Sequence, residues 1–403
     1  MKKVFKASIL LFLLASVFLV ACGDNGASDE DGIKVGVLFS RSGSEAVTEN
    51  GMANAALMAI EEINEQGGVN GKKLIPIEED IESSSSVAAE KIRKVIMEDE
   101  VIATVGAYTS AARQAMLPIV EQNDSLLLYP TLYEGEEYSK NIIYTGATPN
   151  QQLQEFVPWL LDNEGKKFFF IGNDYVYPVQ TNNQVKELLK LNGGQVVGEE
   201  YVPLGHSEFS SILNKIKKEK PDVIFSDLVG SSVAAFYSQY KDYGFKPAEM
   251  PIASPIMAET DIEAMGNNVA EGHITSFNYF QSVATPENEK FVKDYHDKYG
   301  QNEPITAVMQ SSYVSVYLLK EALEKAGDNP DTETLVKAFA GIEFNAPEGT
   351  IRVDEKNNHT WLHSRIGRVN QEGQFEILVE KEPIKPEPWS ELLFPDHPKP
   401  WEG

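Results

Sequence analysis

The stretch Ile33-Lys34-Val35-Gly36-Val37-Leu38-Phe39 decides the fold of this chain, because a short β-rich run is followed at once by a loop and a helix. The loop, residues 40–44, contains serine and glycine beside a single arginine. After it, apolar residues recur at helical spacing from Met52 to Ile63, and Gly67-Gly68 ends the pattern. Strand, loop and helix in this order form the first half of a βαβ unit, so the stretch predicts a parallel sheet covered by helices.

The alternation continues along most of the chain and restarts after Pro149. Before Pro149, the pattern predicts strands at residues 73–79, 102–105, 126–129 and 142–144, and a helix at 88–97. After it, the pattern predicts strands at 167–171, 196–202, 223–226 and 252–254, and helices at 151–161, 185–191, 209–217, 309–325 and 332–339. Three later runs, at 351–353, 365–369 and 375–379, are typical of antiparallel strands, with a hairpin turn at 371–374.

These patterns predict an α/β protein with two doubly wound parallel-sheet lobes, joined by a hinge that the chain crosses three times. The first lobe is expected to combine residues 33–145 with 279–345, and the second 146–278 with 346–389. Residues 390–403 are left as a C-terminal tail. In doubly wound sheets, ligands bind beyond the carboxyl ends of the strands, so the functional residues are expected there.

The N-terminus has the layout of a secretion signal. Lysines precede an apolar run at residues 7–21, which is too short to span a bilayer core of roughly 30 Å. The run ends in Leu19-Val20-Ala21-Cys22, which resembles a bacterial lipobox. Residues 1–21 are therefore predicted to be a lipoprotein signal peptide, Cys22 the lipidated residue and residues 22–32 a flexible tether. The alternative is a plain signal peptide with an incidental cysteine.

The composition excludes some classes of partner and of membrane attachment. The formal net charge of −26 argues against nucleic acid as a partner and against adhesion to anionic lipid through a basic patch. The single cysteine cannot form a disulfide within the chain. No later apolar run reaches transmembrane length, so a lipid anchor would be what holds this extracytoplasmic protein to the cell membrane.

Small hydroxyl side chains and tyrosines follow four of the predicted strands. The segments are Ser40-Arg41-Ser42-Gly43, Gly106-Ala107-Tyr108-Thr109-Ser110, Tyr129-Pro130-Thr131-Leu132-Tyr133-Glu134-Gly135 and Asn173-Asp174-Tyr175-Val176-Tyr177-Pro178. Taken alone, Ser110 could be a helix cap, and each tyrosine could be packing with a satisfied hydroxyl. Together the four segments predict a small, neutral, polar pocket with hardly a cation among its residues.

Several of these segments carry a resemblance to a known family. From about residue 33 to 389, the chain resembles the type I periplasmic binding proteins of the branched-chain amino acid/amide class. Within that class it is most similar to the amide-binding regulator of the aliphatic amidase operon and to the urea-binding component of urea ABC transporters. The Tyr-Pro-x-x-Tyr-Glu-Gly pattern at 129–135 and the Asp-Tyr-x-Tyr-Pro pattern at 174–178 are specific to this branch, whereas the pattern at 36–40 is shared widely.

The resemblance implies a set of ligand contacts. The positions that match the amide regulator's contacts are Tyr108, Ser110, Tyr129, Thr131 and Tyr175. One departure is Pro255-Ile256-Met257-Ala258, where the amide regulator has threonines, so a contact from the second lobe is expected to differ. The lipobox places this chain outside the cell, whereas the resemblance is to a cytoplasmic regulator. This difference in location favours a role in transport.

The leading hypothesis is a lipid-anchored receptor that hands urea or a short aliphatic amide to the permease subunits of an ABC transporter. A neutral amide needs hydrogen-bond partners without a counter-ion, and hydroxyls provide them. One alternative is a receptor for leucine-like amino acids, with Ser110 at the carboxylate and Glu259 at the ammonium group, although a surface glutamate at a helix start also explains Glu259. A ligand-sensing domain coupled to a signalling partner is a further alternative.

The sequence does not favour an enzyme. Its six histidines do not fall at the strand ends singled out above, and it contains no P-loop, no Gly-x-Ser-x-Gly elbow and no zinc-ligand cluster. No catalytic residue, metal or cofactor is therefore expected.

Overall fold

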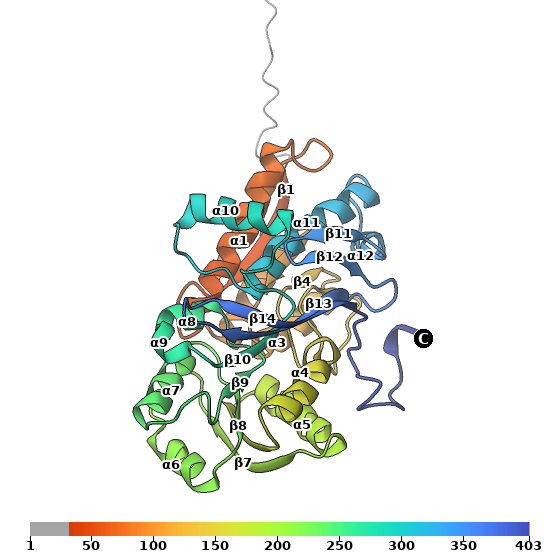
Figure 1. The fold of residues 1–403 in the computed structure, drawn as a ribbon. Helices are drawn as coiled ribbons and strands as arrows, with labels where there is room; N and C mark the ends of the chain where they lie inside the picture. The colour runs from red at the N-terminus through yellow and green to blue at the C-terminus, as the bar shows by residue number, and fades with distance from the viewer. Residues whose placement is uncertain (1–31, 403) are drawn as a thin grey trace, which may run out of the picture.

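The computed structural model describes residues 32–402 and contains two sheets, each with its own helices (Figure 1). The predicted signal peptide, Cys22 and the tether up to residue 31 lie outside the described residues. Within residues 32–402, no helix combines the length and the hydropathy that a membrane crossing requires.

The first sheet has five parallel strands in the order β2–β1–β3–β4–β5. Its strands are β1 (Ile33–Phe39), β2 (Leu74–Asp80), β3 (Ala103–Gly106), β4 (Leu127–Tyr129) and β5 (Ile142–Tyr144). Alternate side chains of β1 enter different parts of the core: Val35 and Val37 pack with α1 (Ala46–Glu65) and α11 (Ala307–Ala326). Leu38 packs with α2 (Ser85–Met97) and α3 (Ser110–Gln122). Both faces of the sheet are thus covered, as the opening stretch predicts.

The second sheet has nine strands, with β14 pairing β13 beside the order β11–β12–β13–β10–β9–β8–β6–β7. The strands are β6 (Lys167–Asn173), β7 (Gln195–Val202), β8 (Val223–Asp227), β9 (Ile252–Ser254), β10 (Ile274–Phe277), β11 (Glu343–Ala346), β12 (Gly349–Val353), β13 (Thr360–Val369) and β14 (Phe375–Ile384). The strands from β6 to β10 pair in parallel, and β11 to β14 pair antiparallel. The predicted α/β fold with parallel sheets and an antiparallel C-terminal part is confirmed.

The helices of the second half follow the same logic. They are α4 (Pro149–Asn163), α5 (Val176–Leu191), α6 (Ser210–Glu219), α7 (Ser231–Asp242), α8 (Glu259–Met265), α9 (Asn267–Ala270), α10 (Pro286–Tyr299) and α12 (Thr332–Phe339), with a short 3₁₀ turn at Pro400–Glu402. Pro149 takes the first position of α4, where its missing N–H group leaves no hydrogen bond unmade. No element is predicted from the sequence between residues 255 and 308, where the structure contains α8, α9, β10 and α10. Helix α10 is mostly polar and buries chiefly Phe291 and Tyr295, so its apolar pattern is weak.

The chain returns to the first sheet after β10. Helix α11 packs on α1, and the Tyr313 hydroxyl donates to Glu62 Oε2 at 2.7 Å. The predicted lobe boundary at 345/346 falls inside the β11–β12 hairpin. We propose a later third crossing, where the Thr360 hydroxyl at the start of β13 donates to the Tyr144 carbonyl at 3.0 Å. The other lobe boundaries stay predictions.

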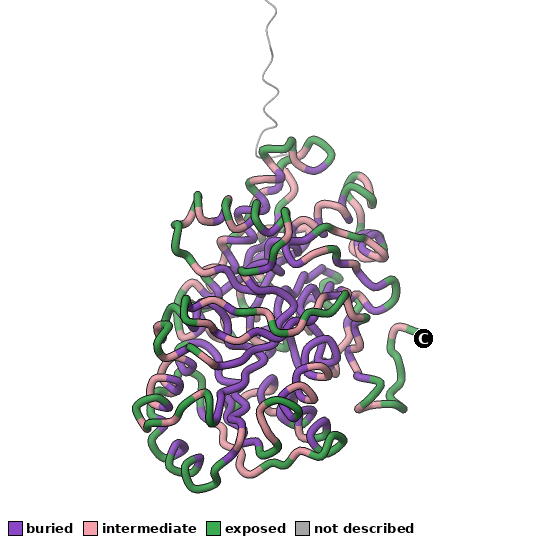
Figure 2. Tube along the Cα trace, in the orientation of Figure 1, coloured by how far each residue is buried: buried purple, intermediate pink, exposed green. Residues whose placement is uncertain are grey.

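Buried positions gather in the middle of the molecule, between the β1 sheet and the β8 sheet (Figures 1 and 2). One continuous apolar cluster includes Val37 of the first sheet and Ile224 of the second. The carboxyl ends of the strands of both sheets are therefore the place to look for a site.

Candidate functional site

Two adjoining cavities lie where strand ends of the two sheets meet. The first encloses about 240 Å³ of space, part of it open to solvent, and is lined by Tyr108, Ser110, Thr131, Leu132, Tyr175, Tyr177, Val229 and Ile256. The second encloses about 350 Å³ on the same measure and is lined by Thr48, Tyr108, Leu132, Leu228, Val229, Gly230, Val233, Ile256, Ala258, Asp261, Phe277, Thr306 and Val308. Four residues line both cavities: Tyr108, Leu132, Val229 and Ile256. The two cavities therefore form one cleft.

The structure brings four of the five predicted contacts to this cleft, namely Tyr108, Ser110, Thr131 and Tyr175. Tyr129 is fully buried and does not line either cavity; its hydroxyl donates to the Tyr108 carbonyl at 2.7 Å. The Thr131 hydroxyl likewise donates to the Ala107 carbonyl at 3.0 Å. Tyr129 thus holds the backbone of a cleft residue, whereas Thr131 both holds the loop and lines the cleft.

Ser110 is the first residue of α3. The N-cap of this helix is Thr109, whose hydroxyl accepts a hydrogen bond from the Ala112 N–H at 3.2 Å. The Ser110 hydroxyl donates to Glu134 Oε2 at 2.5 Å and accepts from Arg113 Nη1 at 3.1 Å. Its oxygen is therefore fixed in position by a carboxylate and a guanidinium before any solute arrives.

A buried ion-pair network that the sequence analysis missed lies behind Ser110. The Arg113 guanidinium donates to Glu134 Oε1 and to Glu137 Oε1, both at 2.8 Å, and its carbon lies 4.6 Å from the centre of the Tyr133 ring. Burial alone would lower the pKa of Arg113, but the two carboxylates hold that pKa well above its ordinary value. Glu134 belongs to the Tyr-Pro-x-x-Tyr-Glu-Gly pattern that the sequence shows. The pattern does not indicate that the partner of Glu134 is Arg113 on α3.

One histidine does lie beside a strand-end segment, which the sequence analysis did not foresee. His359 Nε2 is 2.6 Å from the Tyr133 hydroxyl, and its ring stacks on Tyr144 with 4.1 Å between the ring centres. Burial lowers the pKa of His359 to about 3, so the ring is neutral. These contacts fix the segment after β4, and His359 itself lines neither cavity.

The second sheet presents a different surface to the cleft. Val229 and Ile256 follow β8 and β9 and line both cavities. Ile256 and Ala258 belong to the Pro-Ile-Met-Ala departure noted above, so apolar groups stand where hydroxyls were expected from the resemblance. Tyr175, the N-cap of α5, is the polar contact from this side that was predicted, and burial raises its pKa well above the ordinary value.

Buried carboxyl groups in and around the cleft are a further feature that the sequence did not indicate. Asp261 lines the second cavity and Glu45 precedes α1; burial raises the pKa of each to about 7. Glu259 is buried, which contradicts its interpretation as a surface residue, and its carboxylate accepts from the Gln281 N–H at 2.9 Å. Burial raises the pKa of Glu259 to about 8.

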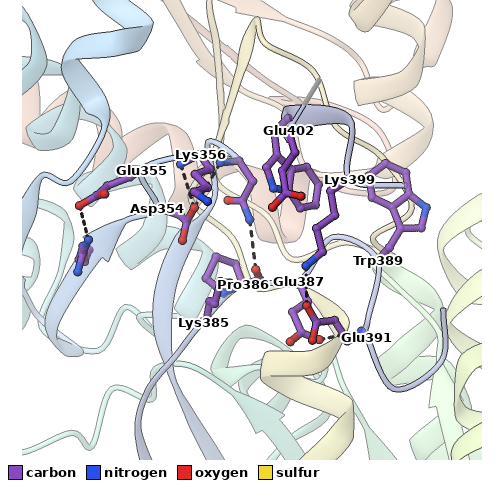
Figure 3. A pocket seen from close by; sticks show the side chains of 13 residues that line it. Asp354, Glu355, Lys356, Lys385, Pro386, Glu387, Trp389, Glu391, Lys399 and Glu402 are labelled. Atoms are coloured by element: carbon purple, nitrogen blue, oxygen red, sulfur yellow. Dashed lines mark hydrogen bonds and ion pairs between the residues drawn. The ribbon is translucent and has the colours of Figure 1, made fainter. Parts of the chain in front are cut away.

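A separate hollow lies between the C-terminal segment and the turn after β12 (Figure 3). Four of its charged side chains form two ion pairs: Lys399 donates to Glu391 Oε1 at 2.8 Å, and Arg352 donates to Glu355 Oε1 at 2.6 Å. It contains none of the predicted contacts, and none of its lining side chains has a buried polar atom without a partner. The cleft between the sheets is therefore the stronger candidate.

Comparisons with known proteins agree with this architecture. A family model described as a periplasmic binding protein domain matches residues 33–394. A curated relative, Leu/Ile/Val-binding protein homolog 6 of Brucella melitensis, is 26% identical over 368 residues, which cover 89% of this chain and 90% of the relative. It is not described as an amide- or urea-binding protein, so the closer resemblance to that branch stays a prediction.

Solved structures match the fold over most of the chain. A solute-binding protein of an ABC transporter from Rhodopseudomonas palustris, in complex with 3,4-dihydroxybenzoic acid, has a TM-score of 0.81 at 24% identity, covering 88% of this chain and 98% of that one. LivJ from Streptococcus pneumoniae, in complex with isoleucine, has a TM-score of 0.77 at 21% identity, covering 88% and 100%. At these identities the matches establish the fold alone.

Proposed function

The chain belongs to the periplasmic binding protein family, and we propose that it is the extracytoplasmic substrate-binding protein of an ABC transporter. Its solute would bind in the cleft between the two sheets and be delivered to permease subunits in the membrane. The observation that carries the proposal is the convergence of Tyr108, Ser110 and Thr131 from the first sheet with Tyr175 from the second on one cavity. A solute that bridges the two sides would favour the closed arrangement.

The proposed solute is urea or a short aliphatic amide. Such a molecule offers carbonyl lone pairs and N–H donors without a net charge, and hydroxyl groups match both. The cavity at Ser110 and Tyr175 is narrow and lined by only eight residues, which favours a short molecule.

A leucine-like amino acid is the second candidate. It is favoured by the relative named as a Leu/Ile/Val-binding homolog and by the apolar groups Leu132, Val229 and Ile256, which would suit a branched side chain. It lacks a cationic partner for its carboxylate among the residues that line the cleft.

Calorimetric titration of the mature chain with urea, formamide, acetamide and leucine separates these candidates. We expect an amide or urea to bind and small-angle scattering to report a more compact protein in its presence. Leucine binding without a response to any amide would move the assignment to the second candidate. Binding of no solute would contradict the proposed function.

The proposed attachment to the membrane is a lipid on Cys22, which the lipobox-like stretch Leu19-Val20-Ala21-Cys22 supports. Cys22→Ser should release the protein in soluble form from the native host, as fractionation and mass spectrometry would detect. A surface-retained chain that carries no lipid and begins elsewhere would refute this interpretation.

A further inference from the structure

Glu45, an acidic residue in the first half of the chain, packs against a residue of the second half. Glu45 lies against Gly230, the N-cap of α7: a methyl group on Gly230 would lie 2.8 Å from each carboxylate oxygen of Glu45. Glu45 Oε1 accepts from the Ser44 hydroxyl at 3.0 Å, whereas Oε2 is buried without a hydrogen-bond partner among the described residues. Gly230 itself lines the second cavity, whereas Glu45 packs directly against it, so the unpartnered oxygen lies next to a residue of the cleft.

A second acid, Asp261, lines this cavity itself. Asp261 lies in the first turn of α8, and its Oδ2 accepts from the Ala258 N–H at 2.8 Å. Burial raises the pKa of Asp261, and the nearby charge of Glu45 adds to the increase. Glu45, from the first half of the chain, and Asp261, from the second, are thus close enough for the charge of one to raise the pKa of the other.

No cationic side chain of the cleft lining pairs with these acids. The residues that line the two cavities include no lysine, arginine or histidine. Glu49 is a further buried acid beside Glu45; its Oε2 accepts from the Ser40 N–H at 2.7 Å, and burial raises its pKa to about 8. Asp227, at the end of β8, is buried with neither oxygen hydrogen-bonded among the described residues. The cation behind Ser110, Arg113, is already paired with two glutamates.

We propose that Glu45 and Asp261 set the charge selectivity of the cleft, admitting neutral or cationic nitrogenous head groups such as amides and amidines and rejecting carboxylates. This inference rests on the proposed function and narrows its solute class. Above a pH of about 7, where both acids are ionised, a carboxylate would add a third negative charge beside them, whereas N–H donors and positive charge pair with them.

Selectivity of this kind makes a distinctive prediction for pH. Acids whose pKa is higher in the closed form favour closure at low pH, and this contribution is lost as the pH rises through about 7. A neutral amide should therefore bind about tenfold more weakly per carboxyl at pH 8 than at pH 6. An amidinium ion stays charged across this range and pairs with the ionised acids, so its affinity should rise instead.

Acetamide, acetamidine and acetate test the proposal, because they have nearly the same shape and differ in charge. Calorimetry of the mature chain at pH 6 and pH 8 should give opposite pH slopes for acetamide and acetamidine, and acetate should bind at least about tenfold more weakly than acetamide at pH 8. Glu45→Gln and Asp261→Asn should each reduce the preference for acetamidine. Glu263→Gln, an exposed charge change on the same helix α8, should leave it unchanged.

The outcomes are distinct. Parallel pH slopes, acetate binding as tight as acetamide binding, or variants that keep the wild-type preference would overturn the selectivity while leaving the transport function in place. Leucine binding tighter than leucinamide binding would also overturn it. If none of these solutes binds, the proposed function fails together with the selectivity. The slopes of the wild-type protein decide the matter even where a variant does not fold.

Discussion

The two sides of the cleft present different chemistry to a solute. The first-sheet side presents hydroxyl groups that internal hydrogen bonds hold in position, with Ser110 fixed between Glu134 and Arg113. The second-sheet side presents the apolar groups Val229 and Ile256 beside the carboxyl group of Asp261, with Tyr175 as its hydroxyl contact. This difference suggests a division of roles: one side orients a polar head group, and the other excludes water and selects charge.

Removing the buried cation on the first-sheet side should have the largest effect. Arg113→Met leaves Glu134 and Glu137 without their partner in a buried environment, which typically costs about 3–5 kcal/mol of unfolding free energy. Urea denaturation measures the loss. Arg352→Met, at the partly exposed pair with Glu355, is the control and should cost less than about 1 kcal/mol. Equal losses would mean that the network does not fix the first-sheet side.

Blocking the approach of the two sides should weaken solute binding more than folding. An added methyl at Gly230 would meet the Ser44 carbonyl at 2.7 Å, and overpacking of this kind costs about 1–3 kcal/mol, or roughly 5- to 150-fold in affinity. Gly244→Ala is the matched control, because Gly244 also has a positive φ but has no atom within 4 Å of the added methyl. Both variants should lose stability from the backbone conformation, yet calorimetry should find weaker binding in Gly230→Ala alone.

The fixed hydroxyl at the start of α3 should contribute directly to affinity. Ser110→Ala removes one buried hydrogen-bond partner, which typically costs about 1–3 kcal/mol, so solute binding should weaken by roughly 5- to 150-fold. Calorimetry gives the affinity, and thermal unfolding shows how much of the change is structural. A drop in stability with affinity within a factor of about two would mean that Ser110 only supports Glu134.

The smallest effect is expected at Tyr129, which supports a cleft residue without lining the cleft itself. Tyr129→Phe removes the hydroxyl that donates to the Tyr108 carbonyl, at a typical cost of about 0.5–1.5 kcal/mol in stability. Affinity should change less than in Ser110→Ala, because Tyr129 lines neither cavity. A larger loss of affinity in Tyr129→Phe would reverse the order of the two residues.

The sequence was sufficient for the features that depend on local pattern. The βαβ alternation from Ile33 onward and the restart at Pro149 follow from periodicity and helix-start signals, and the strands and helices lie there. Strand-end reasoning also identified the segments that contain Tyr108, Ser110 and Tyr175, because parallel strands place their carboxyl ends together.

Features that depend on long-range packing could not be predicted. Whether Tyr129 faces the cleft or supports it depends on the position of the Tyr108 backbone, and the burial of Glu259 depends on the Gln281 segment. Glu45 and Asp261 are close in space but lie more than two hundred positions apart in the sequence, so no local pattern indicates their proximity.

The crystal structure of the complex with the tightest-binding solute of the calorimetric series tests the assignment of the cleft most directly. We expect the solute to lie in the cleft, with its polar head group within hydrogen-bonding distance of the Ser110 hydroxyl and its other face against Val229 and Ile256. A solute bound in the hollow beside Lys399, or a cleft that stays unchanged and empty in the complex, would contradict it.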